Sequence, residues 1–219
     1  MTSSAARVEE LFPHHLAAVI RWKDADQAYQ AVLAAARAGI GSVEITSGTP
    51  RAFELISRLR QEVGSACLVG AGTITDSDLA RQAIQSGAQY LVTPYLVPEV
   101  EAMTHAAGLF LVMGATTPSE IAQAQAAGAD LVKVFPAAPI GGPAYIQAVR
   151  GPMPDVPLWV SGGVGIGDVA AYLKAGAQVI GLTNDLFRAD LLTSGGTDQI
   201  TKLCHEALRA AGALVPVPA

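Results

Sequence analysis

The sequence predicts an α/β protein built as a (β/α)₈ barrel (TIM barrel) with a short N-terminal helix. Short apolar strands alternate with Ala-rich amphipathic helices, a pattern typical of parallel βαβ units whose sheet is covered on both faces. The expected strands are as many as such a barrel needs to close. They are Leu16–Arg21, Ser42–Thr46, Ala66–Gly70, Gln89–Thr93, Leu109–Met113, Asp130–Phe135, Val156–Ser161 and Gln178–Leu182. An open doubly wound sheet remains the alternative, because a sequence pattern does not show closure.

Local signals mark where each helix begins and ends. Glycine accepts the left-handed conformation that terminates a helix, and the chain then turns directly into a strand. The glycines in this position are Gly39, Gly87, Gly128 and Gly176, with a weaker example at Gly108. Capping signals that start helices are Asp24, Thr75/Asp76, Thr117–Pro118 and Gly165/Gly167. We therefore expect one domain over residues 1–219, with a helix in Met1–Pro13 and a loose tail at 214–219.

Composition excludes several classes of function. The 219 residues are 51% hydrophobic and carry a formal net charge of −5, which argues against a nucleic-acid-binding surface. No segment is long and apolar enough to cross a membrane, and the N-terminus lacks the features of a signal peptide. Only Cys67 and Cys204 are present, without a CxxC motif, so we expect buried structural thiols and a cytoplasmic protein.

Lys133 interrupts an apolar strand, Leu131-Val132-Lys133-Val134-Phe135. Burying an ammonium group there costs on the order of several kcal/mol unless the group is paired or neutral. A neutral amine is the species that attacks a ketone to form an imine. Two interpretations stay open at this point: an imine-forming lysine, or a structural lysine ion-paired inside the barrel mouth.

Glu44 holds the corresponding position in Val43-Glu44-Ile45. Catalytic groups of such barrels lie at the carboxyl ends of the strands, so we expect Glu44 and Lys133 to point into one mouth. The carboxylate could pair with Lys133 structurally, or it could shuttle protons as general acid and base. Aldol cleavage needs such a shuttle, because a hydroxyl proton must be removed when the carbon–carbon bond breaks.

Glycine-rich loops supply the other candidate positions. Ser161-Gly162-Gly163-Val164-Gly165 follows the seventh strand and opens a helix, where free backbone N–H groups favour an anion. With Thr183 after the eighth strand, this loop forms the usual phosphate position of a barrel, although the glycines could also serve only the turn. Gly70-Ala71-Gly72-Thr73 is a similar loop that could hold a carboxylate. The adjacent His14 and His15 form at most a weak metal site, because their side chains would diverge.

These motifs together resemble one family, the class I 2-keto-3-deoxy-6-phosphogluconate (KDPG) and 4-hydroxy-2-oxoglutarate (KHG) aldolases of bacteria. The resemblance runs from about Ala17 to the C-terminal helix. Its most specific motifs are Val43-Glu44-Ile45-Thr46, Val69-Gly70-Ala71-Gly72-Thr73-Ile74, Thr93-Pro94, Val132-Lys133-Val134-Phe135-Pro136-Ala137 and Ser161-Gly162-Gly163-Val164.

The resemblance implies roles for individual residues. Lys133 would form the imine and Glu44 would act as acid and base. Thr73 and Pro94 would line the keto-acid pocket with Phe135 beside it, and the expected phosphate-binding residues are Gly162, Gly163 and Thr183. The family needs no metal or other cofactor, is typically homotrimeric, and splits its small-molecule substrate into pyruvate and glyceraldehyde 3-phosphate.

The chain departs from the family pattern near the substrate. The family usually carries an Arg shortly after the strand-two Glu, where this chain has Ser47-Gly48-Thr49-Pro50-Arg51, so Arg51 is the candidate carboxylate-binding residue. Ser161 keeps a hydroxyl at the end of strand seven where the family has Thr. These changes leave the substrate open: KHG cleavage or oxaloacetate decarboxylation could use the same imine. A phosphosugar isomerase or epimerase, or a non-catalytic barrel that binds a phosphometabolite, are the alternatives of another class.

Overall fold

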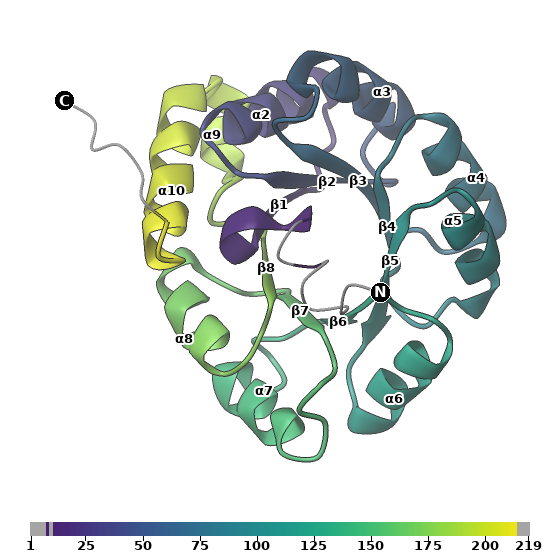
Figure 1. Ribbon diagram of the computed structural model, residues 1–219. Helices are drawn as coiled ribbons and strands as arrows, with labels where there is room; N and C mark the ends of the chain where they lie inside the picture. Colours follow the sequence, from purple (N-terminus) through teal and green to yellow (C-terminus); the bar gives the residue numbers. More distant parts are fainter. Residues whose placement is uncertain (1–7, 9–10, 214–219) are drawn as a thin grey trace.

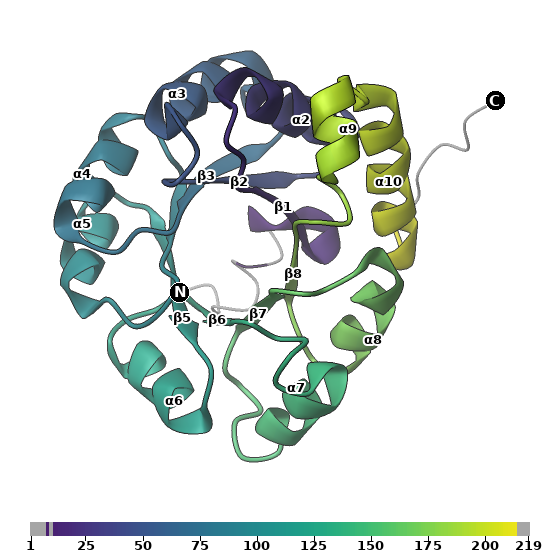
Figure 2. The same cartoon turned by 180° about the vertical axis from the view of Figure 1, so that it is seen from behind.

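A computed structural model of the chain describes Val8 and residues 11–213. Eight parallel strands form a closed barrel in sequence order, with β8 paired to β1 (Figures 1 and 2). The strands are β1 Leu16–Ile20, β2 Ser42–Thr46, β3 Leu68–Gly72, β4 Tyr90–Val92, β5 Phe110–Ala115, β6 Leu131–Val134, β7 Leu158–Ser161 and β8 Val179–Leu182. The predicted barrel is confirmed, and the open sheet is excluded.

The third strand differs most from its predicted bounds. It runs over Leu68–Gly72 instead of Ala66–Gly70, because its ladder with β2 pairs Ser42 with Leu68 and Thr46 with Gly72. Two glycines lower the strand propensity of this segment, so the sequence pattern ended the strand too early. The shift places Gly72 at the carboxyl end of the strand, where the barrel opens.

Helices form a ring around the barrel (Figure 1). They are α2 Ala25–Arg37, α3 Ala52–Val63, α4 Ser77–Gln85, α5 Glu101–Ala106, α6 Pro118–Ala126, α7 Gly142–Arg150, α8 Val169–Lys174, α9 Ala189–Ser194 and α10 Thr197–Ala210. Short 3₁₀ turns are η1 Pro13–His15, η2 Pro98–Val100 and η3 Ile166–Asp168. The predicted caps are present: Asp24 accepts a hydrogen bond from Gln27 N, and Thr117 forms a capping box with Glu120.

Two apolar layers hold the fold together. The larger lies between the strands and the helices, and the smaller fills the inside of the barrel. Phe12 enters the ring of strands and packs edge-on against Tyr90, Phe110 and Trp159, with ring centroids 5.3, 5.8 and 5.4 Å away. Full burial of each such side chain stabilises the fold by about 1.5–3 kcal/mol. This aromatic layer fills the amino end of the barrel interior.

The two ends of the chain carry predictions that the structure describes only in part. The predicted N-terminal helix falls largely outside the described residues, although Val8 and Leu11 are helical. The predicted tail at 214–219 lies entirely outside them. Among the residues that are described, no helix has the length and apolar character needed to span a membrane.

Candidate active site

A cavity of about 540 Å³ opens at the carboxyl ends of the strands. The predicted site residues that line it are Glu44, Thr73, Pro94, Lys133, Phe135, Ser161, Gly162, Gly163 and Thr183. They come from six different strands or the loops that follow them, so closure of the barrel brings them together. This is the place where (β/α)₈ barrels carry their active sites.

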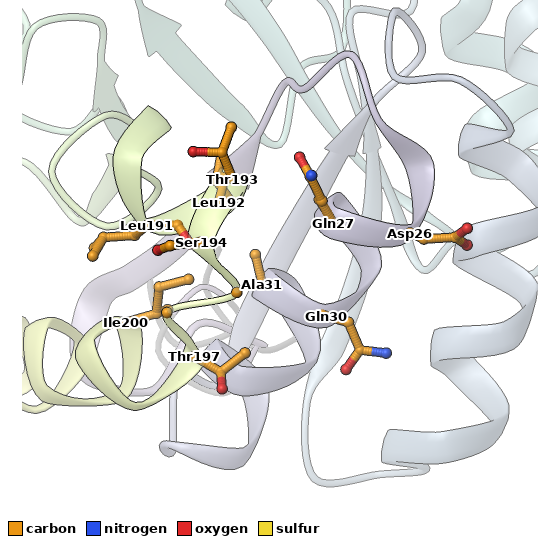
Figure 3. A pocket seen from close by; sticks show the side chains of 12 residues that line it. Asp26, Gln27, Gln30, Ala31, Leu191, Leu192, Thr193, Ser194, Thr197 and Ile200 are labelled. Carbon is orange, nitrogen blue, oxygen red and sulfur yellow. The ribbon is translucent and has the colours of Figure 1, made fainter.

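A second hollow, of about 370 Å³, lies between α2 and the segment of α9 and α10 (Figure 3). Asp26 is the only ionisable residue among those that line it. The hydroxyl of Thr193 there donates within its own helix, to the carbonyl of Ala189. This hollow offers no nucleophile with a neighbouring base, so the barrel mouth is the candidate active site.

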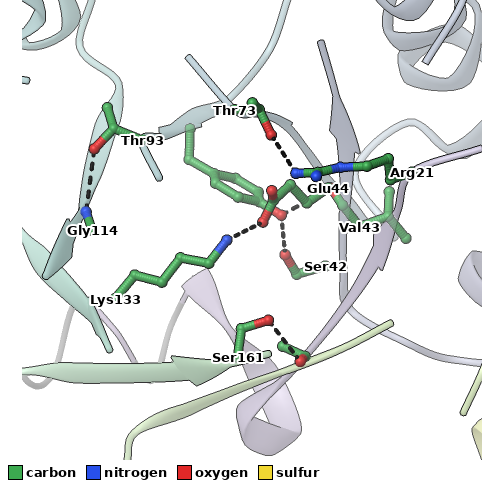
Figure 4. A network of polar contacts seen from close by, with 11 residues as sticks. Arg21, Ser42, Val43, Glu44, Thr73, Thr93, Gly114, Lys133 and Ser161 are labelled. Atoms are coloured by element: carbon green, nitrogen blue, oxygen red, sulfur yellow. Dashed lines mark hydrogen bonds and ion pairs between the residues drawn. The ribbon is translucent and has the colours of Figure 1, made fainter. Parts of the chain in front are cut away.

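Lys133 and Glu44 face each other across the barrel mouth. Nζ of Lys133 lies 3.5 Å from Oε2 of Glu44 (Figure 4). Lys133 is 7% exposed and Glu44 is 1% exposed. The pair is therefore almost fully removed from water and lines the cavity, so a ligand bound there would contact both side chains.

The backbone around Glu44 is built to leave room for its side chain. A Cβ atom on Gly72 would lie 1.7 Å from Oε1 of Glu44, so no other residue fits there without displacing the carboxylate. Gly70, the register partner of Glu44, likewise leaves room for the ring of Tyr90. Burial raises the pKa of Tyr90 well above its ordinary value, and the nearby Glu44 carboxylate adds to this effect. Tyr90 therefore stays neutral beside Glu44.

Arg21 is a site residue that the sequence analysis missed. It follows β1 directly, lines the cavity, and its Nη2 donates a hydrogen bond to Oγ1 of Thr73 at 3.1 Å (Figure 4). The sequence signal that could have identified Arg21 is its position at the carboxyl end of a predicted barrel strand, where active-site residues lie. Thr73 has φ 58°, a strained conformation for a β-branched residue.

Arg51 is not where the sequence analysis expected it. It lies at the start of α3, half-exposed, and is absent from the residues that line the cavity. Its guanidinium pairs with Glu54 at 2.5 Å and with Asp26 at 3.6 Å. The left-handed backbone of Arg51 begins the helix here and directs the side chain to these carboxylates. In this chain, the arginine in the cavity is Arg21.

The end of the cavity beyond strands seven and eight carries carboxylates. Asp168 accepts a hydrogen bond from Gly165 N at 3.2 Å, and Asp185 accepts one from Ile166 N at 2.9 Å. Ser161 Oγ donates to the carbonyl of Gly181 at 3.0 Å (Figure 4). Two of the N–H groups at this helix start are therefore already hydrogen-bonded to protein side chains.

Gly162 and Gly163 have φ angles of 88° and 76°. A Cβ atom on Gly162 would lie 2.9 Å from the ring of Phe135, and one on Gly163 would lie 2.9 Å from Cβ of Ala138. The turn after β7 therefore requires both glycines for backbone geometry and for close packing, whatever ligand it binds.

Other candidate nucleophiles and metal ligands lie elsewhere. Cys67 and Cys204 are free and buried, and burial raises the pKa of each thiol to about 12, so neither is a ready nucleophile. His14 and His15 lie in η1, and Nδ1 of His15 is hydrogen-bonded to the carbonyl of Gln178. Within the described part of the chain, no group of three or more potential metal-binding side chains comes together.

Comparison with known proteins places this geometry in a family. Residues 8–203 match the family described as KDPG and KHG aldolase. The chain is 33% identical over 175 residues to the 2-dehydro-3-deoxy-6-phosphogalactonate aldolase of Escherichia coli, covering 80% of this chain and 85% of that protein. It is 31% identical over 194 residues to the E. coli KHG/KDPG aldolase, covering 88% and 90% of the two chains.

A solved structure agrees with these relatives. The KDPG aldolase of Legionella pneumophila, with pyruvate captured as a covalent carbinolamine intermediate, superposes with a TM-score of 0.81. The two sequences are 25% identical, and the match covers 93% of this chain and 97% of that one. The family match, the relatives and the barrel with its lysine and glutamate lead to the same conclusion: the chain belongs to the KDPG and KHG aldolase family and is a lyase of the aldolase type.

Proposed function

We propose that this chain is a class I aldolase that cleaves a 2-keto-3-deoxy acid through an imine on Lys133. The observation that carries the proposal is the buried Lys133 amine, 3.5 Å from the Glu44 carboxylate, in a cavity at the carboxyl ends of the strands. The carbinolamine captured in the Legionella relative supports it, because a carbinolamine is the adduct that precedes an imine.

The two residues divide the chemistry between them. Nζ of Lys133 attacks the C2 carbonyl carbon, and the carbonyl oxygen leaves as water to give a protonated imine. Glu44 takes the proton of the C4 hydroxyl as the C3–C4 bond breaks, and the electron pair of that bond flows into the iminium, which leaves a neutral enamine and a free aldehyde. Glu44 returns the proton to C3, and water hydrolyses the imine to release pyruvate and the amine.

The substrate carboxylate would lie against Arg21 and Thr73. Arg21 is the arginine that lines the cavity, and Oγ1 of Thr73 already accepts its hydrogen bond. A guanidinium and a hydroxyl together can bind a carboxylate through charge-assisted hydrogen bonds. This assigns to Arg21 the role that the sequence pattern suggested for Arg51.

The remainder of the substrate would extend toward strands seven and eight. KDPG, which gives pyruvate and glyceraldehyde 3-phosphate, would place its phosphate near Gly162, Gly163 and Thr183. A specific observation favours KHG as the second candidate: Asp168 and Asp185 line this end of the cavity and occupy N–H groups of the turn. The ratio of kcat/KM values for phosphorylated and unphosphorylated substrates distinguishes the two.

Borohydride trapping tests the imine. The protein is incubated with pyruvate, reduced with borohydride, digested, and mapped by mass spectrometry. We expect a reduced adduct on the peptide that contains Lys133, and none in Lys133→Met. Absence of the adduct, under conditions that trap a known imine-forming enzyme, would refute the proposal and would favour an isomerase, an epimerase or a non-catalytic barrel.

We also propose that the chain assembles as a homotrimer, as the family resemblance implies. A structural neighbour belongs to a protein cage designed by fusing symmetric oligomeric domains, which supports an oligomeric state for this type of barrel. Light scattering during size-exclusion chromatography measures the molar mass directly, and a monomer would contradict this part of the proposal.

A further inference from the structure

Trp159 lies directly beside the reactive amine. It is the register partner of Lys133 on the neighbouring strand β7, and both side chains point into the barrel. Nζ of Lys133 lies 5.8 Å from the centroid of the Trp159 ring. The ring of Phe135 lies 5.7 Å from the same atom. Two aromatic rings thus lie within cation–π distance of the nitrogen that would become the imine.

The indole of Trp159 is held rigidly in this place. It is 0% exposed and packs edge-on against Phe12, with ring centroids 5.4 Å apart. Its ring centroid lies 6.1 Å from that of Tyr90. A Cβ atom on Gly181 would lie 2.5 Å from Nε1 of Trp159, so β8 carries a glycine where the indole needs space. The ring cannot move away from Lys133 without displacing the aromatic layer inside the barrel.

The indole N–H does not explain why a tryptophan stands here. Nε1 of Trp159 is buried and has no hydrogen-bond partner among the described residues. Burying an unpaired donor is unfavourable, and a phenylalanine would avoid that cost while filling most of the same space. The larger π surface, which gives tryptophan the strongest cation–π attraction of the aromatic residues, does explain it.

From these contacts we infer that Trp159 is a positioning residue whose ring stabilises the positive charge on the Lys133 imine nitrogen. The inference rests on the proposed imine and adds a role for a residue outside the expected site. The iminium must stay protonated until the electrons of the C3–C4 bond flow into it. Glu44 is ionised while the iminium is charged, and the face of the Trp159 ring adds a second, fixed partial negative charge from the neighbouring strand.

The other charged groups around the amine are unchanged in each variant proposed below, so their effect on the stability of the iminium stays the same. Glu44 on β2 faces the amine at 3.5 Å, and Arg21 after β1 lines the same cavity. Asp168 and Asp185, after β7 and β8, line it as well. A change confined to the ring of Trp159 therefore isolates the effect of the ring on the iminium.

The test is the pH dependence of kcat, which reports groups of the enzyme–substrate complex. Weaker stabilisation of the iminium moves the basic limb of this profile to lower pH. In Trp159→Leu we expect a shift of roughly 0.5 to 1 pH unit, and in Trp159→Phe a smaller shift in the same direction. Phe110→Leu is the matched control. Phe110 belongs to the same inner cluster as Trp159, but the β5 residue that pairs with Lys133 is Gly114, not Phe110.

Incorporation of fluorinated tryptophan at position 159 provides a second test, which does not depend on whether Trp159→Leu folds. The chain has two tryptophans, so a Trp22→Phe background leaves Trp159 as the only site of incorporation. Trp22 is absent from the residues that line the cavity. Fluorine withdraws electrons from the ring with little change in its size, so each added fluorine should move the basic limb further toward low pH.

The outcomes separate this inference from the proposed function. A graded shift across the fluorinated series, with Phe110→Leu unchanged, supports the role of Trp159. An unchanged basic limb in the series, or an equal shift in Phe110→Leu, overturns it, even where borohydride still traps pyruvate on Lys133. Failure of that trapping in the unaltered protein is a failure of the proposed function itself.

Discussion

Arg21 donates a hydrogen bond from Nη2 to Oγ1 of Thr73 at 3.1 Å, joining the end of β1 to the end of β3 at the mouth of the barrel. Thr73 keeps a positive φ of 58° to present this hydroxyl. A strained residue at a ligand-facing position indicates that the surrounding structure stabilises that geometry. The pair supplies one cation and one hydroxyl to the same part of the cavity.

Loss of this cation should weaken substrate binding. In Arg21→Gln we expect KM for the keto acid to rise about 10- to 100-fold with a smaller change in kcat, because charged hydrogen bonds contribute about 1.5–3 kcal/mol. Steady-state kinetics measures this. Arg51→Gln is the matched control and should change KM less than about twofold, since Arg51 pairs with Glu54 outside the cavity. An equal rise in both variants would rule out the assignment to Arg21.

The sequence predicted the barrel and the central pair, but it did not show that the sheet closes. Alternation of apolar strands and capped helices indicates parallel βαβ units, and closure is seen only in the pairing of β8 with β1. An ionisable residue inside an apolar strand is conspicuous in either sheet. Lys133 and Glu44 were therefore recognisable from their own strands. Their 3.5 Å separation was not, because it depends on closure of the barrel between strands far apart in the chain.

The arginine could not be assigned from spacing alone. Arg51 was chosen because it follows Glu44 at nearly the family distance, but the backbone at Arg51 turns left-handed to begin α3 and directs the side chain to Glu54. Periodicity does not encode such loop conformations. Trp159 was missed for a related reason: alternation gives the inward direction of a strand residue but not its partners, which here include Phe12 and Tyr90.

Replacement of Glu44, the proposed acid–base residue, should separate imine formation from turnover. In Glu44→Gln we expect kcat for cleavage to fall about 10²- to 10⁴-fold, because a positioned acid–base group contributes that much. Borohydride should still trap pyruvate on Lys133 in this variant, although more slowly. Trapping that persists while cleavage is lost is the expected signature. Cleavage within tenfold of the unaltered enzyme would show that another group moves the proton.

Gly72 should be as sensitive to substitution as Lys133 and Glu44, the proposed catalytic pair. Its added Cβ atom would lie 1.7 Å from Oε1 of Glu44, so Gly72→Ala must displace the carboxylate. We expect kcat to fall at least about 100-fold and the free energy of unfolding to fall by about 1–3 kcal/mol. Enzyme kinetics and urea denaturation measure the two effects.

A second glycine controls for a general effect of alanine in this region. A Cβ atom on Gly48, in the loop after β2, meets no atom within 4 Å. Gly48→Ala should therefore keep kcat within about twofold and change stability by less than about 0.5 kcal/mol. Full activity in Gly72→Ala would show that Glu44 can move without loss of function.

His105 should make stability depend on pH near neutrality. Its Nδ1 lies 2.7 Å from Oε1 of Glu101, and its Nε2 lies 3.1 Å from Oδ2 of Asp130. These contacts link α5 to Asp130, the residue before β6. Partial burial lowers the pKa of His105, but the hydrogen bonds to Asp130 and Glu101 outweigh it, so the pKa is raised overall. A histidine whose pKa is raised by folding stabilises the protein fully below its unfolded pKa of about 6.5. That stabilisation disappears as the pH rises through the folded pKa.

Urea denaturation between pH 5.5 and 8.5 measures this effect. The unaltered protein should exceed His105→Gln in free energy of unfolding by the largest margin at pH 5.5, and the margin should shrink steadily above about pH 6.5. His205→Gln is the matched control, because within the described residues the side chain of His205, on α10, makes no ion pair. A margin that is constant with pH, or that grows as pH rises, would mean that folding does not favour the protonated form of His105.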